Sequence, residues 1–255
     1  ILSLKSCVMS NPIQTIPFPN LALAFIPVIA VVAIIWRWEL GYKRSLYAVF
    51  RMLIQLLLIG YFLSFIFESD SSLIVIAVLA VMLFTSSWIA LHTKNIPRRI
   101  LYMKSLWSIS LGGGIILLLI TQGVLNLKPW YLPSYVIPLA GMIFANAMNS
   151  VSLAVERLEA EIERDVLYEQ ARIIAFRASL IPVVNSLFAV GIVSLPGMMT
   201  GQILSGVSPF IAARYQIMVM CMIFGSAGIS SAFFLTLVRS DFMTKEKLES
   251  TDTKH

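Results

Sequence analysis

Four groups of polar or helix-breaking residues inside long apolar stretches could handle a solute. The first is Arg51 with Gln55, which are four residues apart and therefore share one face of a helix. A cation inside a bilayer costs about 3 kcal/mol unless it reaches water or a partner. Two interpretations stay open: the arginine extends to the membrane surface, or it faces a water-filled vestibule together with Gln55.

Three asparagines supply the second and third groups. Asn146 and Asn149 are three residues apart and share a helix face, and Asn185 lies in a later apolar stretch. Polar side chains inside membranes commonly hydrogen-bond between helices, with a gain of about 0.6–2 kcal/mol each. These amides therefore either join neighbouring helices or contact a transported substrate.

The fourth group is Pro196, Gly197, Met198 and Met199, within the run SLPGMMTG at 194–201. Proline removes a helical hydrogen bond and clashes with the preceding turn, so we expect a break or kink near Pro196. Irregular backbone at membrane depth is tolerated where it is buried or lines a wet cavity, and transport sites are often built on broken helices. The alternative is a structural kink at which small residues pack against another helix.

The apolar stretches offer little for covalent or hard-metal chemistry. They contain no Asp, Glu or His, so neither a nucleophile with its base nor an oxygen-rich cation site is predicted. The chain's two cysteines lie far apart and it has only two histidines, which makes a Cys/His metal site unexpected. Thioethers of the methionines could bind soft metals such as Cu(I), or serve as flexible packing. We expect no metal site and no cofactor in this chain.

The composition places these groups in a bilayer. Apolar residue types make up 58% of the 255 residues and charged types 13%, whereas a soluble domain carries about 25% charged residues. Too little polar surface remains to cover a soluble globule. The net charge of +6 is spread over short groups rather than one basic face, which argues against nucleic-acid binding.

Crossing a hydrocarbon core of about 30 Å takes roughly 20 helical residues. Backbone groups in lipid must bond within their own segment, so each long apolar stretch is predicted to be helical. The predicted fold class is an all-α integral membrane protein with about seven transmembrane helices. The predicted spans are Leu21–Trp36, Ser45–Phe67, Leu73–Leu91, Ser105–Leu125, Tyr135–Val155, Leu180–Leu204 and Tyr215–Val238.

The basic residues predict the orientation. Connections 37–44, 92–104 and 156–179 and the tail after 238 together hold fifteen Lys and Arg, whereas the alternate side holds Lys5 and Lys128. Because cytoplasmic loops carry the excess of Lys and Arg, we expect the N-terminus outside and the C-terminus in the cytoplasm. The predicted organisation is an extracytoplasmic lead 1–20, a transmembrane domain 21–238 and a cytoplasmic tail 239–255.

The connection 156–179 is expected to be a charged cytoplasmic helix. It carries six of the chain's thirteen acids, and Leu158, Ile162 and Val166 recur every four residues as one apolar stripe. The stripe packs either on the protein itself or on a cytoplasmic partner. The sequence contains no GxxxxGK[ST] phosphate-binding loop, so energy from ATP would have to come from another subunit.

Several runs together resemble one family of membrane proteins. They are RMLIQ at 51–55, VIPLAGMI at 136–143 followed by NAM at 146–148, LIP at 180–182, GIVSLPGMMTG at 191–201 and YQIM at 215–218. The chain resembles FetB-type permeases over about residues 21 to 238, and the plant aluminium-tolerance permeases look like the same family. The run LPGMMTG is the most specific of these motifs.

The resemblance implies the membrane half of a two-component ABC exporter for iron. It further implies a permease homodimer, a separate cytoplasmic ATPase of the FetA type that binds ATP, and a multi-pass position in the inner (plasma) membrane. One departure concerns residues 165–170, where the family usually carries a longer loop with glycine and this chain has DVLYEQ.

The substrate pathway is hypothesised to include Arg51, Gln55, Asn146, Asn149, Asn185, Pro196, Gly197, Met198 and Met199. Docking of the ATPase is hypothesised at Leu158, Ile162, Val166, Arg164, Glu169 and Arg172. The alternatives are a stand-alone secondary carrier and an ABC permease for a non-metal solute such as a nucleotide sugar. A proton-driven carrier usually needs acidic residues or histidine in its spans, and the predicted spans have none.

Overall fold

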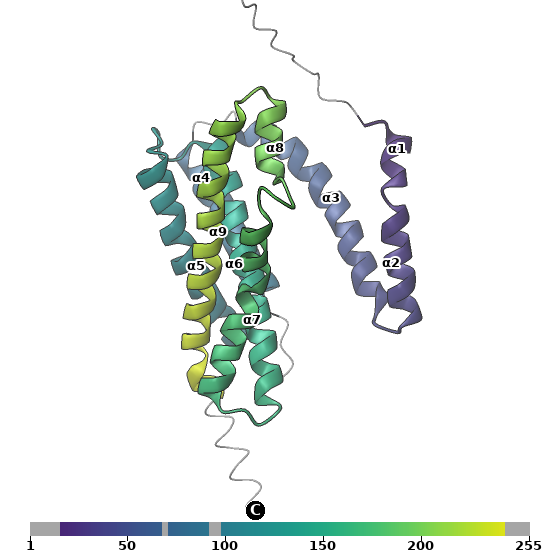
Figure 1. Ribbon diagram of the computed structural model, residues 1–255, viewed down its shortest axis with the longest axis vertical. Coiled ribbons are helices and arrows are strands. Elements are labelled where there is room, and N and C mark those ends of the chain that lie inside the picture. The colour runs from purple at the N-terminus through teal and green to yellow at the C-terminus, as the bar shows by residue number, and fades with distance from the viewer. Residues whose placement is uncertain (1–15, 68–70, 92–97, 243–255) are drawn as a thin grey trace, which may run out of the picture. The chain divides into compact units, whose positions relative to one another are not determined.

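The computed structural model describes residues 16–67, 71–91 and 98–242, which are helical over most of their length. Residues 1–15 of the predicted lead and 243–255 of the predicted tail lie outside the described residues. The elements are α1 (Phe18–Leu23), α2 (Ile26–Arg37), α3 (Tyr42–Phe67), α4 (Ser72–Ile89), α5 (Arg98–Leu118), the π-helix η1 (Leu119–Val124), α6 (Pro133–Ile162), α7 (Tyr168–Ala189), α8 (Gly197–Leu204) and α9 (Pro209–Leu237), as Figure 1 shows.

Seven helical segments of the described chain are long and apolar enough to cross a membrane, which confirms the predicted fold class. They are α1 with α2, then α3, α4, α5 with η1, α6, α7 and the segment Pro209–Phe242 that contains α9. The chain divides into two compact units. The first holds α1–α3 and groups with residues 204–206, and the second holds α4–α9.

In the first unit, α2 and α3 contact each other across a short turn. The backbone of Glu39 has a φ of 58°. The N–H of Glu39 donates to the carbonyl of Trp36 (3.1 Å), and the N–H of Leu40 donates to that of Ile35 (3.0 Å). These two bonds form a Schellman motif, which satisfies the last carbonyls of α2 and ends it.

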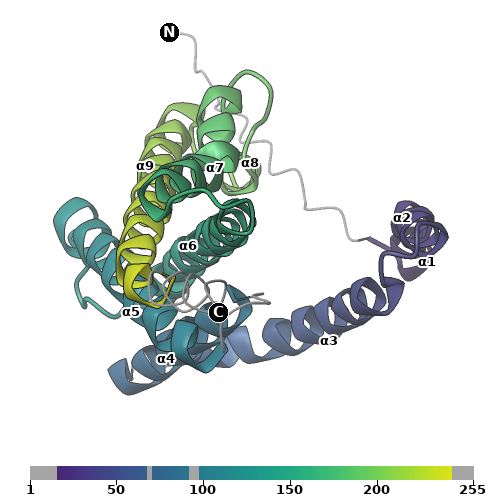
Figure 2. The ribbon, with the colours of Figure 1, turned by 90° about the horizontal axis from the view of Figure 1, so that it is seen from below.

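The second unit is built around α6. Its buried residues recur at helical spacing along its length, and the apolar ones from Leu139 through Ile143 and Val151 to Leu158 belong to one hydrophobic core. Helix α6 contacts α4, α5, α7 and α9, and it lies inside the group formed by these helices in Figure 2. Thirty residues give α6 a length of about 45 Å, which is more than a hydrocarbon core needs. Its last two turns, which carry charged residues, account for the extra length.

Glycines let α5 approach two neighbours closely. A Cβ on Gly112 would lie 2.4 Å from Ser230 Oγ and 2.8 Å from Ser230 N on α9. A Cβ on Gly113 would lie 3.0 Å from Ile143 Cγ2 and 3.1 Å from Phe144 Cδ1 on α6. Gly112 and Gly113 of the glycine run are therefore packing positions. Larger residues there would push α5 away from α9 and α6.

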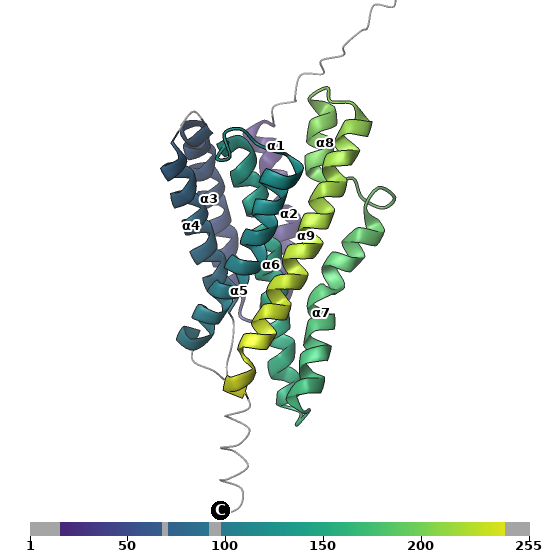
Figure 3. The same ribbon diagram turned by 90° about the vertical axis from the view of Figure 1, so that its left-hand side faces the viewer.

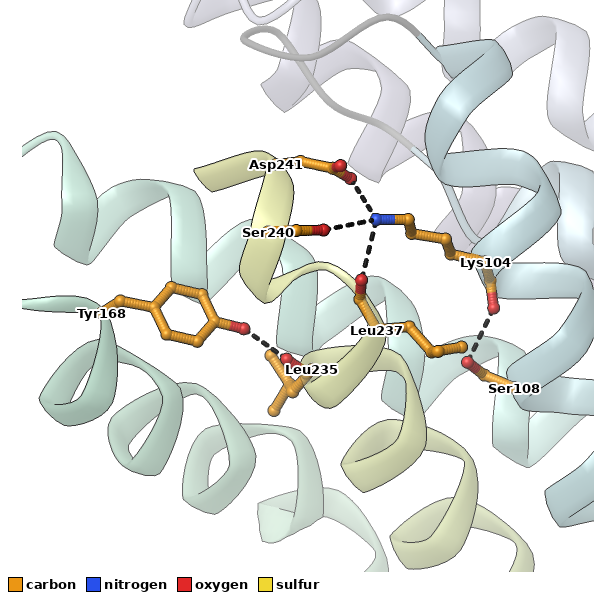
Figure 4. Close-up of polar contacts among 7 residues, drawn as sticks. All are labelled: Lys104, Ser108, Tyr168, Leu235, Leu237, Ser240 and Asp241. Atoms are coloured by element: carbon orange, nitrogen blue, oxygen red, sulfur yellow. Dashed lines mark hydrogen bonds and ion pairs between the residues drawn. The ribbon is translucent and has the colours of Figure 1, made fainter. Parts of the chain in front are cut away.

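Polar contacts join the helices at one end of the second unit (Figure 4). Lys104 Nζ on α5 donates to the carbonyl of Leu237 (2.7 Å) and to Asp241 Oδ2 (2.6 Å). The hydroxyl of Tyr168, the first residue of α7, donates to the carbonyl of Leu235 on α9. At this end, α5 and α7 are thus both attached to the last turns of the α9 segment.

The structure differs from the prediction at residues 156–179, which do not form a helix of their own. Residues up to Ile162 continue α6, and residues from Tyr168 begin α7, so the sixth span is Tyr168–Ala189. The turn between them is closed by bonds from Asp165 N to Ile162 O (3.0 Å) and from Val166 N to Glu161 O (3.1 Å). Figure 3 shows α7 beside α9 along this part of the unit.

Candidate transport cavity

A cavity of about 400 Å³ lies between α6, α7, α9 and the segment that leads into α8. Five of the sequence-predicted pathway residues line it: Asn146, Asn149, Pro196, Gly197 and Met198. The structure thus brings two of the four predicted groups together, the asparagines of α6 and the proline run. Asn185 and Met199 are not among the lining residues.

The cavity's wall is formed where α7 breaks. Helix α7 ends at Ala189, whose carbonyl accepts hydrogen bonds from the N–H groups of Val193 (2.8 Å) and Ser194 (3.1 Å). Gly191 has a φ of +83° and its N–H donates to the carbonyl of Ser194 (2.9 Å), a conformation that favours glycine. The predicted break near Pro196 is confirmed, but the helix stops well before the proline, which directly precedes α8 instead.

Amides and serines supply the polar groups of the cavity. Asn146 Nδ2 donates to the carbonyl of Met142 one turn earlier (2.8 Å), so this amide is partly occupied within its own helix. Gln216 on α9 lines the cavity and is only 5% exposed, and its Oε1 has no hydrogen-bond partner. A buried carbonyl without a donor costs about 1–3 kcal/mol. Gln216 is therefore the polar group that stands to gain most from a bound solute or water.

The sequence-based prediction missed Gln216, although a signal was present. It is the one amide in the apolar sequence of α9, as Asn146 and Asn149 are the amides of α6. The reasoning that selected those asparagines applies to it equally. Which side chains share the cavity with Gln216 could not be predicted from the sequence, because helix pairing depends on the tertiary fold.

Among the described residues, those lining the cavity carry no charge. Besides amides and serines, the lining contains Met142, Met198 and Met220, whose thioethers are soft, flexible and apolar. No group of three or more His, Cys, Asp or Glu side chains that could hold a metal occurs in the described part of the chain. The cavity therefore suits a solute that has no exposed charge, or a cation bound by uncharged donors.

Arg51 and Gln55 lie on α3 in the first unit. With the amide of Gln55 turned so that its oxygen faces the guanidinium, Oε1 accepts from Arg51 Nε (3.1 Å) and Nη2 (3.3 Å). The arginine thus has a polar partner on its own helix, as the predicted spacing indicated. Neither residue is among those lining the cavity of the second unit.

The predicted docking stripe packs on the protein's own core. Leu158 is fully buried at 0% exposure, and Ile162 and Val166 pack against the same core. Leu158 is therefore out of a partner's reach, whereas Ile162 and Val166 pack on the core and remain partly exposed.

The charged members of the docking set pair near the α6–α7 turn. Arg164 lies 3.4 Å from Glu161, and Glu169 forms ion pairs with Arg172 (2.8 Å) and with Arg239 (2.9 Å). Arg164 keeps 66% of its side chain exposed. Arg164, Glu169 and Arg172 form the rim of the α6–α7 turn, and this rim, unlike Leu158, is accessible.

A helical, multi-pass membrane protein with an uncharged cavity beside a broken helix has the architecture of a transport protein. Comparison with known proteins identifies the family to which the chain belongs. The model of the uncharacterised protein family UPF0014 matches residues 18–243, and the chain belongs to this family. No solved structure matches it.

Three relatives illustrate the family. The chain is 34% identical to the probable iron export permease protein FetB of Escherichia coli K12, over 92% of this chain and 96% of that protein. It is 34% identical to Protein ALUMINUM SENSITIVE 3 of Arabidopsis thaliana, over 86% and 87%. A UPF0014 membrane protein of Synechocystis is 38% identical over 80% and 85%. The resemblance inferred from the sequence motifs is confirmed.

Proposed function

We propose that this chain is the membrane-spanning permease subunit of an ABC exporter that moves iron, as a chelate, across the cell's inner (plasma) membrane. The likeness to a protein named as a probable iron export permease, over nearly its whole length, supports this cargo. The uncharged cavity beside the broken α7 carries the proposal, because it offers a solute a path through the helices.

The lining of the cavity favours a chelate over a bare ion. Iron cations prefer carboxylate, imidazole or water ligands, and the cavity's described lining supplies amides, serines and thioethers. A chelator that keeps the metal's ligands in place would present a surface that these groups can bind. A nucleotide sugar would bring a diphosphate, for which this lining holds no cation.

Energy would come from a partner, since the sequence contains no phosphate-binding loop of its own. The accessible rim of the α6–α7 turn supports docking there: Arg164 is exposed, and Leu167 at the tip has 62% of its surface exposed. In this proposal two copies of the permease bind two cytoplasmic ATPase subunits, and the permease itself catalyses no reaction.

The test is transport by inside-out vesicles that contain the permease with or without a co-expressed ABC ATPase. We expect radiolabelled iron, supplied as an uncharged ferric tris-hydroxamate chelate, to accumulate only when both subunits and ATP are present. Accumulation driven by a proton gradient without nucleotide would show a secondary carrier instead. ATP-driven uptake of a nucleotide sugar, with none of the uncharged ferric chelate, would keep the ABC assignment and overturn the cargo.

A further inference from the structure

A second, smaller cavity of about 220 Å³ adjoins the first. It is lined by residues of α6, α8 and α9 and by Leu125, which follows the π-helix η1. Met142 on α6 and Met198 on α8 line both cavities. The two spaces are therefore neighbours that share these two thioether side chains.

The order of lining residues along α6 places the cavities in series. Ser134, Tyr135, Pro138 and Leu139 line the smaller cavity and precede Met142, whereas Asn146, Asn149, Ser150 and Leu153 line the larger one and follow it. From Ser134 to Leu153 the helix rises about 28 Å, which is close to the thickness of a hydrocarbon core of about 30 Å. Together the two cavities extend over most of a membrane's depth.

Helix α8 gives the same order independently. Gly197 at its start lines the larger cavity, Met198 lines both, and Gln202 one turn later lines the smaller one. The boundary between the cavities thus falls at a methionine on each of two helices that are far apart in the sequence.

Each cavity has its own buried amide without a partner. Gln216 Oε1 lies at the larger cavity and Gln202 Oε1 at the smaller one, and neither has a hydrogen-bond partner. Unpartnered buried carbonyls are costly and are normally satisfied by water or a ligand. Both cavities therefore have a position where a polar group of a passing solute would be stabilised.

We propose that Met142 and Met198 form a gate between two chambers in series on the cargo pathway, with Gln216 and Gln202 as the amide contacts on either side. This inference rests on the proposed transport function of the larger cavity. Methionine suits such a gate, because it is unbranched, has three rotatable bonds and fills irregular gaps. With the predicted orientation, the smaller chamber is the outer one, because it adjoins the connection 126–134.

The gate is tested by labelling single cysteines from outside intact cells with a membrane-impermeant maleimide. The background carries Cys7→Ser and Cys221→Ser. Gln202→Cys probes the outer chamber and Asn149→Cys probes the inner one. We expect Gln202→Cys to be labelled and Asn149→Cys to be protected. Adding Met142→Ala with Met198→Ala should speed labelling of Asn149→Cys by about tenfold or more, which corresponds to about 1.4 kcal/mol of gate-closing contacts.

The matched control is Met148→Ala, which removes a methionine side chain from α6 at a position that lines neither cavity. It should leave the labelling rate unchanged. If Asn149→Cys is labelled rapidly with both gate methionines present, or if the control has the same effect as the gate variants, the gate does not exist. An unlabelled Gln202→Cys would overturn the outer position of the smaller chamber.

A replacement variant and the choice of host cell keep the result interpretable. Met198→Ala alone, which leaves α6 intact, replaces the double variant if the latter does not fold, and it should still raise the labelling rate. The labelling is done in cells that express the permease without a co-expressed ABC ATPase, so a failed ATPase assignment leaves the gate result standing. Conversely, ATP-driven transport without gated labelling would refute the gate and keep the proposed function.

Discussion

The amide of Gln216 is buried among apolar residues of α9 and makes no hydrogen bond through its Oε1. A group of this kind destabilises the protein unless a water or a solute in the cavity supplies the missing hydrogen bond. Natural sequences rarely keep such a group for stability. A binding role explains Gln216 better than a packing role, since leucine would fill nearly the same volume without the cost of burying an amide.

Replacing the amide should therefore separate transport from stability. We expect Gln216→Leu to lower ATP-driven uptake of the uncharged ferric chelate by about tenfold, the effect of about 1.4 kcal/mol of lost binding, while thermal stability in detergent is equal or higher. Uptake in vesicles and a melting curve measure the two effects. Gln122→Leu, at an exposed glutamine of η1, is the control and should leave uptake unchanged. A Gln216→Leu protein with normal uptake would remove this amide from the pathway.

At this scale the sequence indicates which residue types to examine but not which of them meet. Asn146 and Asn149 were predicted from their place in an apolar stretch, and they do line the cavity. Asn185 satisfied the same criterion and is not among the lining residues. The difference lies in which face of a helix is turned to the cavity, and that depends on packing between helices rather than on the helix's own sequence.

Single backbone positions decide where the helices end and how closely they pack. Asp165 adopts a φ of 60° at the end of α6, and its N–H and that of Val166 close the last turn in a Schellman motif. Glycine is the usual residue there, and aspartate tolerates the conformation at moderate cost. The sequence around 163–167 contains no glycine or proline, so the turn was not recognised and the connection was predicted as one helix.

The glycine run of α5 allows a matched pair of substitutions that tests how closely the helices pack. Gly112→Ala would place a Cβ 2.4 Å from Ser230 Oγ and 2.8 Å from its backbone nitrogen, so α5 and α9 must separate. We expect it to destabilise the protein by about 1–3 kcal/mol, as overpacking does. Gly114→Ala meets nothing within 4 Å and should raise stability by up to about 1 kcal/mol through helix propensity. Denaturation in mild detergent compares the two, and equal stabilities would contradict the close α5–α9 contact.

The number of spans was predictable because it depends on length and hydropathy, which the bilayer imposes on each segment separately. All seven spans were found, but the sixth was predicted at Leu180–Leu204 and the structure places it at Tyr168–Ala189. Arg172 and Arg177 in α7 led to the error, since charges were taken to lie outside a span. Arg172 is paired with Glu169 (2.8 Å), which is the kind of compensation that hydropathy alone does not reveal.

Within the second unit, the contacts suggest how a partner could act on the cavity. Tyr168 and Glu169 at the start of α7 bond to Leu235 and Arg239 of the last helical segment, so a displacement of the α6–α7 turn would move both together. Further along α7, Ser179, Pro182 and Val183 line the larger cavity. A docked subunit at the turn would therefore be connected to the cavity wall through one continuous helix.

That connection predicts which residue at the turn an ATPase needs. Leu167 is 62% exposed between the end of α6 and the start of α7, and an exposed apolar side chain at the tip of a turn suits a socket on a partner. We expect Leu167→Glu to weaken binding of a co-expressed ABC ATPase by about 2 kcal/mol, or roughly thirtyfold. The measurement is the ratio of ATPase to permease after affinity purification, followed by ATP-driven uptake of the uncharged ferric chelate.

The control has the same exposure at a position predicted to face the other side of the membrane. Leu204, the last residue of α8, is also 62% exposed, and Leu204→Glu should leave the ratio unchanged because the adjoining connection, predicted at 205–211, is expected to lie outside. Loss of the ATPase in both variants would indicate damage to the fold rather than to a docking site. Retention in the Leu167→Glu protein would place the docking site elsewhere, and the route from the turn through α7 to the cavity would then lose its physical basis.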